Sequence, residues 1–423
     1  MMKNKRALAG GIALIGALSL VASACGSKKK SSETTVAAAT ETTVAVTETT
    51  AATETTAPST ETSAAASTET SAAAAGADTT VAGGDTTVAG AAAGASGKVG
   101  VILPDSKSSV RWETADRPFL EEAFKAGGVQ YDIQNAEGDA AKMQTIADSM
   151  IAAGAKVLAI VNLDSASGAA IEKKADAAGV KTIDYDRLTL GGSAAAYISF
   201  DNVKVGNLQG EGLKKCLADK GVKPASIIEL HGSPDDNNAT LFKQGYQDAI
   251  KGAVAAGDIK VVGDQAVPKW DNVQGGTIFE QLLTKAGGKI DGVLAANDGL
   301  GGAAIAVLKK NGLQVPVTGQ DATADGLKAI LAGDQCMTVY KAVKTEAAAA
   351  AAAAIALLKG ATPDTAGATV HDGTGNRDVP AVLATPVAIY KDSVKDVIAD
   401  KFVKKEDVCT ADLAKACTDA GIV

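Results

Sequence analysis

From Lys98 onward, short apolar segments alternate with longer segments of helical periodicity, and this order constrains the fold more than any other feature of the chain. The first series of predicted strands comprises residues 99–103, 129–133, 157–161 and 180–185, and the second comprises residues 226–230, 259–262, 292–295, 315–318 and 336–340. Strands that alternate with helices form parallel sheets with helices on both faces. We therefore predict an α/β fold of two Rossmann-like lobes, which divide near residues 199–202.

The segments between the predicted strands have the spacing of amphipathic helices. Residues 118–126 and 140–153 repeat apolar side chains at helical intervals. Gly154 and Gly179 stand where glycine commonly ends a helix. The alternation of strand and helix is therefore supported by helix-ending residues as well as by hydrophobicity.

The N-terminal end has the pattern of an export signal. In residues 1–24, basic side chains precede an apolar stretch that ends in small residues. The sequence Ala22-Ser-Ala-Cys25 resembles a lipoprotein signal, in which the cysteine is lipidated, and an ordinary signal peptide cut near Ala24 is the alternative. The apolar stretch is shorter than the roughly 20 residues of a spanning helix, and the Ala-rich residues 347–358 predict a packed helix. We expect Cys25 to anchor the protein to the outer face of the cell membrane.

Residues 25–97 are predicted to form a disordered tether. They repeat short motifs of Ala, Thr, Ser, Glu and Gly, and after Lys30 they contain no aromatic or basic residue before Lys98. Such a segment cannot bury enough apolar surface to offset the entropy lost on ordering. We expect it to hold the folded residues 98–423 away from the membrane.

The charge and the rare residue types narrow the possible functions. A formal net charge of −8 argues against nucleic acid as the main partner, and two histidines make histidine catalysis or a His-rich metal site improbable. We expect no cofactor. Cys409 and Cys417 are predicted to form a disulfide, whereas Cys216 and Cys336 could be a second bridge or two buried thiols.

Polar or aromatic residues follow nearly every predicted strand. In parallel sheets, ligands bind beyond the carboxyl ends of the strands. The chain has only two tryptophans, and both stand in polar surroundings that do not resemble a core. The candidate site residues are Arg111, Trp112, Asp186, Arg187, Asp236, Asn238, Trp270, Asn297, Asp321 and Lys341.

This set of side chains suits a sugar. Aromatic faces pack on the C–H patches of a sugar ring, and charged and amide groups bind its hydroxyls. The glycines after Asn297 lack the pattern of a phosphate loop, so we expect them to begin a tightly packed helix. Asp236 and Asp321 could be the catalytic pair of a glycosidase, but neither lies in an evident apolar pocket. We therefore expect that the protein is not an enzyme. Asp184 is expected to be a solvated charge.

Several ordered motifs carry a family resemblance. They include Asp184-Tyr-Asp-Arg187, Gly232-Ser-Pro-Asp-Asp-Asn-Asn-Ala239, Gly319-Gln-Asp-Ala322 and Met337-Thr-Val-Tyr-Lys341. The chain resembles the periplasmic sugar-binding proteins of the ribose/galactose type (type I), and within that family its D-xylose-binding members. The resemblance covers residues 98 to about 408.

The resemblance implies two lobes joined by a hinge of three crossovers, near Asp201, after Lys341 and near Leu383. Lobe 1 would comprise residues 98–201 and 342–383, and lobe 2 would comprise residues 202–341 and 384–423. The ten candidate residues would bind the ligand, with Trp112 and Trp270 stacking on it. His231 is expected beside the cleft.

The implied function is capture of a monosaccharide and its delivery to an ABC permease by a monomeric receptor. Xylose is the first choice, followed by glucose, galactose or arabinose. The loop at residues 105–110 is rich in serine where the family has more charge, and this leaves the choice between pentose and hexose open. A sensor that presents sugar to a chemoreceptor or a histidine kinase is the alternative.

Overall fold

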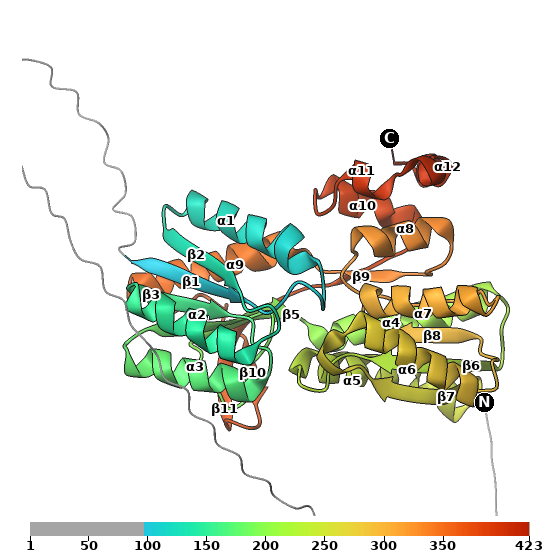
Figure 1. Ribbon diagram of the computed structural model, residues 1–423, viewed down its shortest axis with the longest axis horizontal. Helices are drawn as coiled ribbons and strands as arrows, with labels where there is room; N and C mark the ends of the chain where they lie inside the picture. The colour runs from blue at the N-terminus through green and yellow to red at the C-terminus, as the bar shows by residue number, and fades with distance from the viewer. Residues whose placement is uncertain (1–96, 423) are drawn as a thin grey trace, which may run out of the picture. The chain divides into compact units, whose positions relative to one another are not determined.

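The computed structural model describes residues 97–422 (Figure 1). The predicted signal peptide, Cys25 and the tether up to residue 96 therefore lie outside the described residues. Within residues 97–422, no helix is both long and apolar enough to cross a membrane.

A seven-stranded sheet forms the first half of the fold, in the order β10-β11-β5-β4-β3-β1-β2. Its strands are β1 (Lys98–Leu103), β2 (Gln130–Asn135), β3 (Ala155–Ile160), β4 (Lys181–Tyr185), β5 (Ala196–Phe200), β10 (Thr369–Asp372) and β11 (Arg377–Ala384). All neighbouring strands are parallel except β10 and β11, which form an antiparallel hairpin at the edge. The prediction of a parallel α/β sheet is confirmed.

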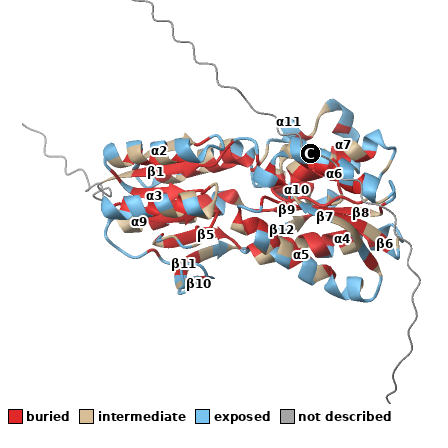
Figure 2. Ribbon diagram, turned by 60° about the horizontal axis from the view of Figure 1, so that its bottom comes forward, coloured by how far each residue is buried: buried red, intermediate tan, exposed pale blue. Residues whose placement is uncertain are grey.

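Helices cover both faces of this sheet because its strands are apolar on both sides. Val99 and Val101 of β1 pack with one cluster, which includes residues of α1 (Arg117–Ala126) and α9 (Val343–Leu358). Ile102 faces the opposite cluster, with residues of α2 (Ala140–Ala152) and α3 (Ser165–Ala177). In Figure 2 the strands are mostly buried, whereas the helices have exposed outer faces.

The second half contains two smaller sheets. The parallel sheet β7-β6-β8 comprises β6 (Ala225–His231), β7 (Ile259–Ala266) and β8 (Gly292–Ala295), and β9 (Thr338–Tyr340) pairs antiparallel with β12 (Val387–Ile389). The surrounding helices are α4 (Asn202–Asp219), α5 (Asn237–Ala255), α6 (Asn272–Lys285), α7 (Asp298–Lys310) and α8 (Ala324–Ala332). The chain passes between the two halves three times: after β5, after β9, and between β11 and β12.

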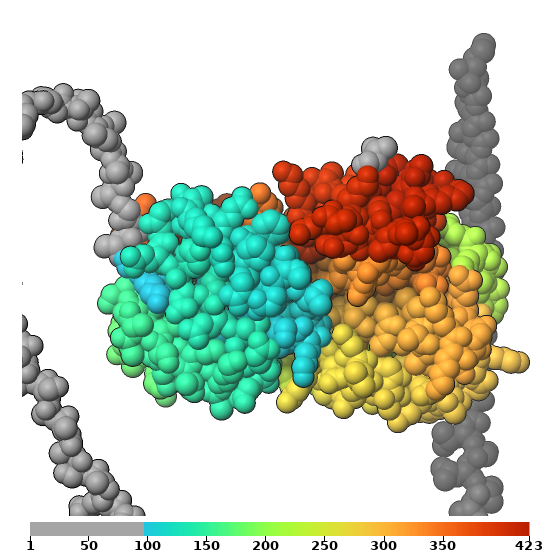
Figure 3. Space-filling model, turned by 45° about the horizontal axis from the view of Figure 1, so that its top comes forward, coloured from blue at the N-terminus to red at the C-terminus, as the bar shows by residue number. Residues whose placement is uncertain are grey.

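The C-terminal segment folds over α8. It contains α10 (Val394–Ala399), α11 (Lys405–Val408) and α12 (Ala414–Asp419), and Figure 3 shows this segment in red on the orange part of the second half. Cys409 and Cys417 form a disulfide within it. A second disulfide joins Cys216 of α4 to Cys336. Of the two possibilities that the sequence left open, a bridge or two buried thiols, the structure has the bridge.

Several elements differ from the prediction. Residues 315–318 do not form a strand, because only Val317 makes an isolated bridge, to Val293. The strands β5, β10, β11 and β12 were not predicted as strands. β12 and the β10–β11 hairpin are short or partly exposed, and they lack the continuous apolar runs of the buried parallel strands.

Candidate functional site

A cavity lies between the two halves, at the carboxyl ends of the strands. Its unfilled space is about 310 Å³, including the part open to solvent, which is near the lower limit for small-molecule pockets. Fourteen residues line it, and they include all ten predicted site residues. The four that were not predicted are Ser108, Ser109, Phe242 and Gln320.

Many of the lining residues lie at the ends of strands and helices, which fix their positions. Asp186 and Arg187 follow β4, and Lys341 follows β9. Asp236 and Asn297 are the N-cap residues of α5 and α7, where each side-chain oxygen accepts a hydrogen bond from a backbone N–H of the helix. The parallel topology and the helix caps therefore bring residues from distant parts of the sequence to one place.

Arg111 is buried among carboxylates. Its guanidinium donates two hydrogen bonds to Asp116, at 2.9 and 2.8 Å, and one to Glu346 at 3.2 Å. It also lies 3.0 Å from Asp186. Burial raises the pKa of Glu346 well above its ordinary range, and repulsion from Asp186 adds to this effect. Asp116, Asp186 and Glu346 together hold the arginine in one orientation.

Lys341 links the two carboxylates that approach the cavity from opposite halves. Its Nζ atom lies 3.5 Å from Asp186 and 3.5 Å from Asp321. Burial raises the pKa of Asp186, but attraction to Lys341 and Arg111 outweighs burial and lowers the pKa to about 2. Asp186 is therefore an ionised hydrogen-bond acceptor at neutral pH.

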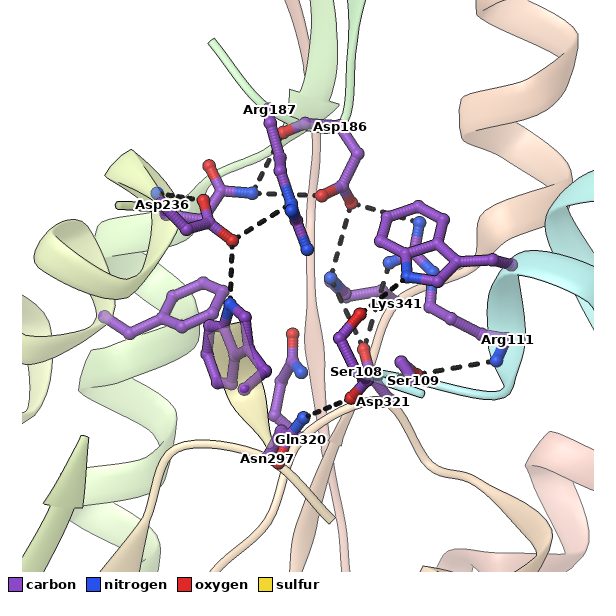
Figure 4. Close-up of a pocket in the computed structure, with 14 residues that line it drawn as sticks. Ser108, Ser109, Arg111, Asp186, Arg187, Asp236, Asn297, Gln320, Asp321 and Lys341 are labelled. Carbon is purple, nitrogen blue, oxygen red and sulfur yellow. Dashed lines mark hydrogen bonds and ion pairs between the residues drawn. The ribbon is translucent and has the colours of Figure 1, made fainter. Parts of the chain in front are cut away.

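A second group of polar contacts surrounds Asp236. Its Oδ2 atom lies 3.0 Å from Nε of Arg187 and accepts a hydrogen bond from Nε1 of Trp270 at 3.0 Å. The side-chain amide of Asn238 donates to the carbonyl and to the carboxylate of Asp186, at 3.0 Å each. Figure 4 shows Asp186, Arg187 and Asp236 at one end of the pocket, opposite Asn297 and Asp321.

The two tryptophans line the cavity, but both are buried, with exposed fractions of 3% for Trp112 and 5% for Trp270. The prediction that their surroundings are not core is therefore wrong, because each ring also packs into an apolar cluster of its own half. The Trp112 ring lies under the guanidinium of Arg111, at 4.4 Å. A side chain at Gly232 would collide with the Trp270 ring, so the glycine gives that ring its place.

Three lining residues have left-handed backbone conformations. The φ angles are 62° for Asp186, 55° for Trp270 and 99° for Asp321. Such angles are uncommon in residues other than glycine and cost roughly 1–3 kcal/mol each. Strain of this kind persists where the surrounding structure fixes it, and here it aims three side chains at one cavity.

The charges of the lining residues cancel. Three cations, Arg111, Arg187 and Lys341, stand against three carboxylates, Asp186, Asp236 and Asp321. Three buried polar atoms of the lining, Nη1 of Arg111, Nε of Arg187 and Oε1 of Gln320, have no hydrogen-bond partner among the described residues, although Nε of Arg187 forms the ion pair with Asp236. A balanced set of charged donors and acceptors, with unpaired polar atoms, suits an uncharged ligand with several hydroxyl groups.

Asp184 differs from expectation. Asp184 is fully buried and not solvated, and its carboxylate accepts hydrogen bonds from the backbone and the hydroxyl of Thr189, at 2.8 and 2.6 Å. Burial raises the pKa of Asp184 well above its ordinary range, and repulsion from Glu172 adds to it. His231 does not line the cavity: its ring contacts the Tyr246 hydroxyl, and burial lowers its pKa to about 4.

The glycines after Asn297 pack closely, as expected from the sequence. A side chain at Gly299 would press on the Asn272 amide, and one at Gly301 would lie 3.0 Å from the carbonyl of Thr318. Within the described part of the chain, no group of three or more His, Cys, Asp and Glu side chains could hold a metal ion.

The four lining residues that were not predicted differ in whether the sequence could have identified them. Gln320 precedes Asp321 directly, so the motif that contains Asp321 could have identified it. Phe242 lies inside α5, where an apolar residue is expected to be core. Ser108 and Ser109 belong to a loop whose direction the sequence does not reveal.

Comparisons with known proteins agree with this geometry. A family model described as a periplasmic binding protein domain matches residues 99–362. The D-xylose-binding periplasmic protein of Escherichia coli is 38% identical over 314 residues, which are 74% of this chain and 92% of that protein. The multiple sugar-binding periplasmic receptor ChvE of Rhizobium radiobacter is 33% identical, over 75% of this chain and 93% of the relative.

Solved structures share the fold. An ABC transporter solute-binding protein from Clostridium phytofermentans with bound β-D-glucose has a TM-score of 0.67 and 27% identity, and covers 74% of this chain and 99% of its own. A carbohydrate transporter solute-binding protein from Chloroflexus aurantiacus, in complex with D-glucose, has a TM-score of 0.66 and 29% identity, over 73% of this chain and 97% of its own. Since the family model covers more than half of the chain and the relatives match nearly their whole length, the chain belongs to the type I periplasmic binding proteins, in the sugar-binding family that the motifs indicated.

Proposed function

We propose that this protein captures an uncharged monosaccharide between two closing lobes and delivers it to an ABC permease. Lobe 1 comprises residues 98–201 and 342–383, and lobe 2 comprises residues 202–341 and 384–423. The observation that carries the proposal is the cavity itself, in which two tryptophans, three cations and three carboxylates from both halves surround one small space.

The chemistry of the lining supports a sugar. A monosaccharide needs apolar faces for its C–H patches and a hydrogen-bond partner for each buried hydroxyl, at a cost of roughly 1–3 kcal/mol for each one left unpaired. The tryptophans supply the faces, and the charged side chains supply bidentate partners for neighbouring hydroxyls. The cancelled charges disfavour sugar acids and amino sugars, because either would leave one charge unpaired in a buried site.

The division of the site supports a closing motion. Arg111, Trp112, Asp186 and Arg187 belong to lobe 1, and the other six proposed ligand-binding residues belong to lobe 2. A ligand that contacts both sets stabilises the closed form more than the open form, which is the condition for closure driven by binding. A permease could then recognise the closed form.

The names of the relatives support binding of a sugar and favour one candidate. Relatives from Escherichia coli and Haemophilus influenzae are D-xylose-binding periplasmic proteins, which makes xylose the first choice, followed by glucose, galactose and arabinose. The relative from Rhizobium radiobacter is called a receptor, and this keeps a sensor that presents sugar to a chemoreceptor or histidine kinase as the second candidate. We further propose a monomer, anchored through lipidated Cys25 to the outer face of the membrane.

The site does not favour a glycosidase. Asp236 and Asp321 would be the acid pair, but Asp236 is engaged by Arg187 and Trp270. Asp321 is engaged by Ser109 and Lys341. Groups that are held by cations and donors are suited to binding hydroxyls and not to delivering a proton to a leaving group.

Calorimetry of the full-length protein tests the proposal. We expect heat on titration with at least one neutral pentose or hexose, and none with glucuronate or glucosamine. The variants Trp270→Ala and Asp321→Ala should each weaken binding at least about tenfold while the circular dichroism spectrum is kept. Absence of heat with every neutral monosaccharide, or wild-type affinity in both variants, would refute the proposal.

A further inference from the structure

The loop that contains Ser108 and Ser109 closes one end of the cavity. Figure 4 shows both serines beside Asn297, Gln320 and Asp321, away from Asp186, Arg187 and Asp236. The loop belongs to the first half of the fold, and the residues it meets belong to the second. This end of the site is therefore formed by direct contact between the two halves.

The contacts of Ser109 and Ser108 are specific. The Ser109 hydroxyl donates a hydrogen bond to Oδ2 of Asp321 at 2.9 Å. The Ser108 carbonyl accepts a hydrogen bond from the side-chain amide of Asn297 at 3.2 Å. Each bond joins residues that are about 200 positions apart in sequence. Together they occupy one carboxylate oxygen and one amide nitrogen that would otherwise face a ligand.

The loop is held in this position by its own hydrogen bonds. Oδ1 of Asp105 accepts from the backbone N–H groups of Lys107 and Ser108, at 2.7 and 2.5 Å, and Oδ2 accepts from the Ser108 hydroxyl at 2.8 Å. The same hydroxyl accepts from Nε1 of Trp112 at 3.2 Å. Because Asp105 and Ser108 are both buried, the loop cannot withdraw without breaking these bonds.

The side chain of Ser109 has the same composition as the hydroxymethyl group that distinguishes a hexopyranose from a pentopyranose. A serine side chain is a hydroxymethyl group, and a hexopyranose such as glucose differs from the pentopyranose xylose by one hydroxymethyl group on the ring. In the structure, the hydroxymethyl group of Ser109 already occupies this end of the cavity and donates to the carboxylate there.

The opposite end is held by direct contacts between its own lining residues. Asn238 contacts Asp186 there, at 3.0 Å, and Arg187 contacts Asp236, also at 3.0 Å. A ring whose additional exocyclic carbon points towards the loop would have to displace Ser109, and one turned the other way would press on these pairs. Overfilling a packed site is costly, and one carbon of difference commonly changes affinity by about tenfold or more.

We propose that Ser109 makes this protein selective for pentopyranoses over hexopyranoses, by holding the position that the hydroxymethyl group of a hexose would need. The inference rests on the proposed function, since it concerns the sugar bound in the same site. Xylose and glucose are the appropriate probes because they differ only in that group.

The decisive variant is Ser109→Gly, because it removes one carbon and one oxygen, the same atoms that glucose adds. We expect the full-length wild-type protein to bind xylose at least about tenfold more tightly than glucose by calorimetry, and Ser109→Gly to reduce this ratio by about tenfold or more. Ser106→Gly is the matched control: it changes the same loop at an exposed residue outside the cavity lining, and should leave the ratio unchanged.

A second variant covers the possibility that Ser109→Gly does not fold, which thermal melting would reveal. Ser109→Ala removes only the hydroxyl and frees Oδ2 of Asp321, so it should shift the ratio towards glucose by a smaller factor. Wild-type protein that prefers glucose, or an unchanged ratio in both variants, overturns the inference but leaves the proposed function intact. Wild-type protein that binds neither sugar nor any other monosaccharide overturns the proposed function itself.

Discussion

Asn238 bonds directly to Asp186 at one end of the cavity, through two hydrogen bonds of 3.0 Å to its carbonyl and its carboxylate. Asn238 lies in the first turn of α5 in the second half of the fold, and Asp186 follows β4 in the first half. Both are buried. This pair therefore joins the two proposed lobes next to the ligand position, and it can exist only when they are close together.

We expect Asn238→Ala to weaken sugar binding by about tenfold or more, because the variant loses a proposed ligand contact and a bond that would favour closure. Titration calorimetry measures the affinity, and small-angle scattering measures closure with and without sugar. Asn311→Ala, at an exposed position after α7, is the matched control and should behave as wild type. Equal affinity in Asn238→Ala and in the control would contradict a role for this pair.

Trp112 and Trp270 should report binding by fluorescence. They are the only tryptophans in the 423 residues, and both line the cavity. A sugar placed between them changes the polarity around both rings, so emission should change on adding a sugar that binds and stay constant on adding one that does not. Trp112→Phe and Trp270→Phe separate the two signals. Constant emission at a sugar concentration that calorimetry shows to be saturating would place the ligand elsewhere.

The raised pKa of Asp184 predicts that the stability of the protein depends on pH. Because burial and the neighbouring Glu172 raise its pKa in the folded protein, the folded state retains a proton that the unfolded chain releases near the ordinary pKa of aspartate. The stability associated with this proton is complete at acidic pH and is lost as the pH rises from that value through the raised pKa.

Asp184→Asn removes this titration. In urea unfolding, the free energy of the wild type should fall more than that of the variant as the pH rises above the ordinary pKa of aspartate. Asp176→Asn, on the exposed side of α3, is the control and should keep the wild-type dependence. Parallel pH profiles for wild type and Asp184→Asn would show that this carboxyl is not the source.

The sequence predicted the parallel α/β fold and the residues that would line one cavity, for the same physical reason. Polar side chains at the carboxyl ends of parallel strands must converge, so Asp186, Asn297 and Asp321 could be assigned to one cavity from their places after predicted strands. The burial of Asp184 could not be predicted, since it depends on a bond to Thr189, whose position the loop geometry decides.

Long-range packing explains the remaining misses. The tryptophans were expected outside the core because their sequence neighbours are polar, yet the Trp270 ring packs on Phe242, 28 positions away, with 6.4 Å between ring centroids. Residues 315–318 have the apolar content of a strand, but only Val317 finds a partner. Local sequence patterns indicate which residues favour burial or a strand conformation. The topology of the fold determines which of these residues are in fact buried or paired in a sheet.

The final prediction concerns Asp116, which touches no ligand position but holds Arg111. Asp116 is fully buried, binds the guanidinium through two hydrogen bonds, and accepts a third from the Tyr185 hydroxyl at 2.9 Å. Asp116→Ala would leave part of a buried guanidinium unpaired, so we expect a loss of about 3–5 kcal/mol in the free energy of unfolding and weaker sugar binding.

Glu346→Gln is the matched comparison for Asp116→Ala. Glu346 contacts the same guanidinium through a single hydrogen bond of 3.2 Å, and glutamine keeps a side-chain oxygen that can accept it. Urea unfolding and calorimetry should therefore show a much smaller effect for Glu346→Gln than for Asp116→Ala. Equal losses in the two variants would mean that Arg111 depends on both side chains alike.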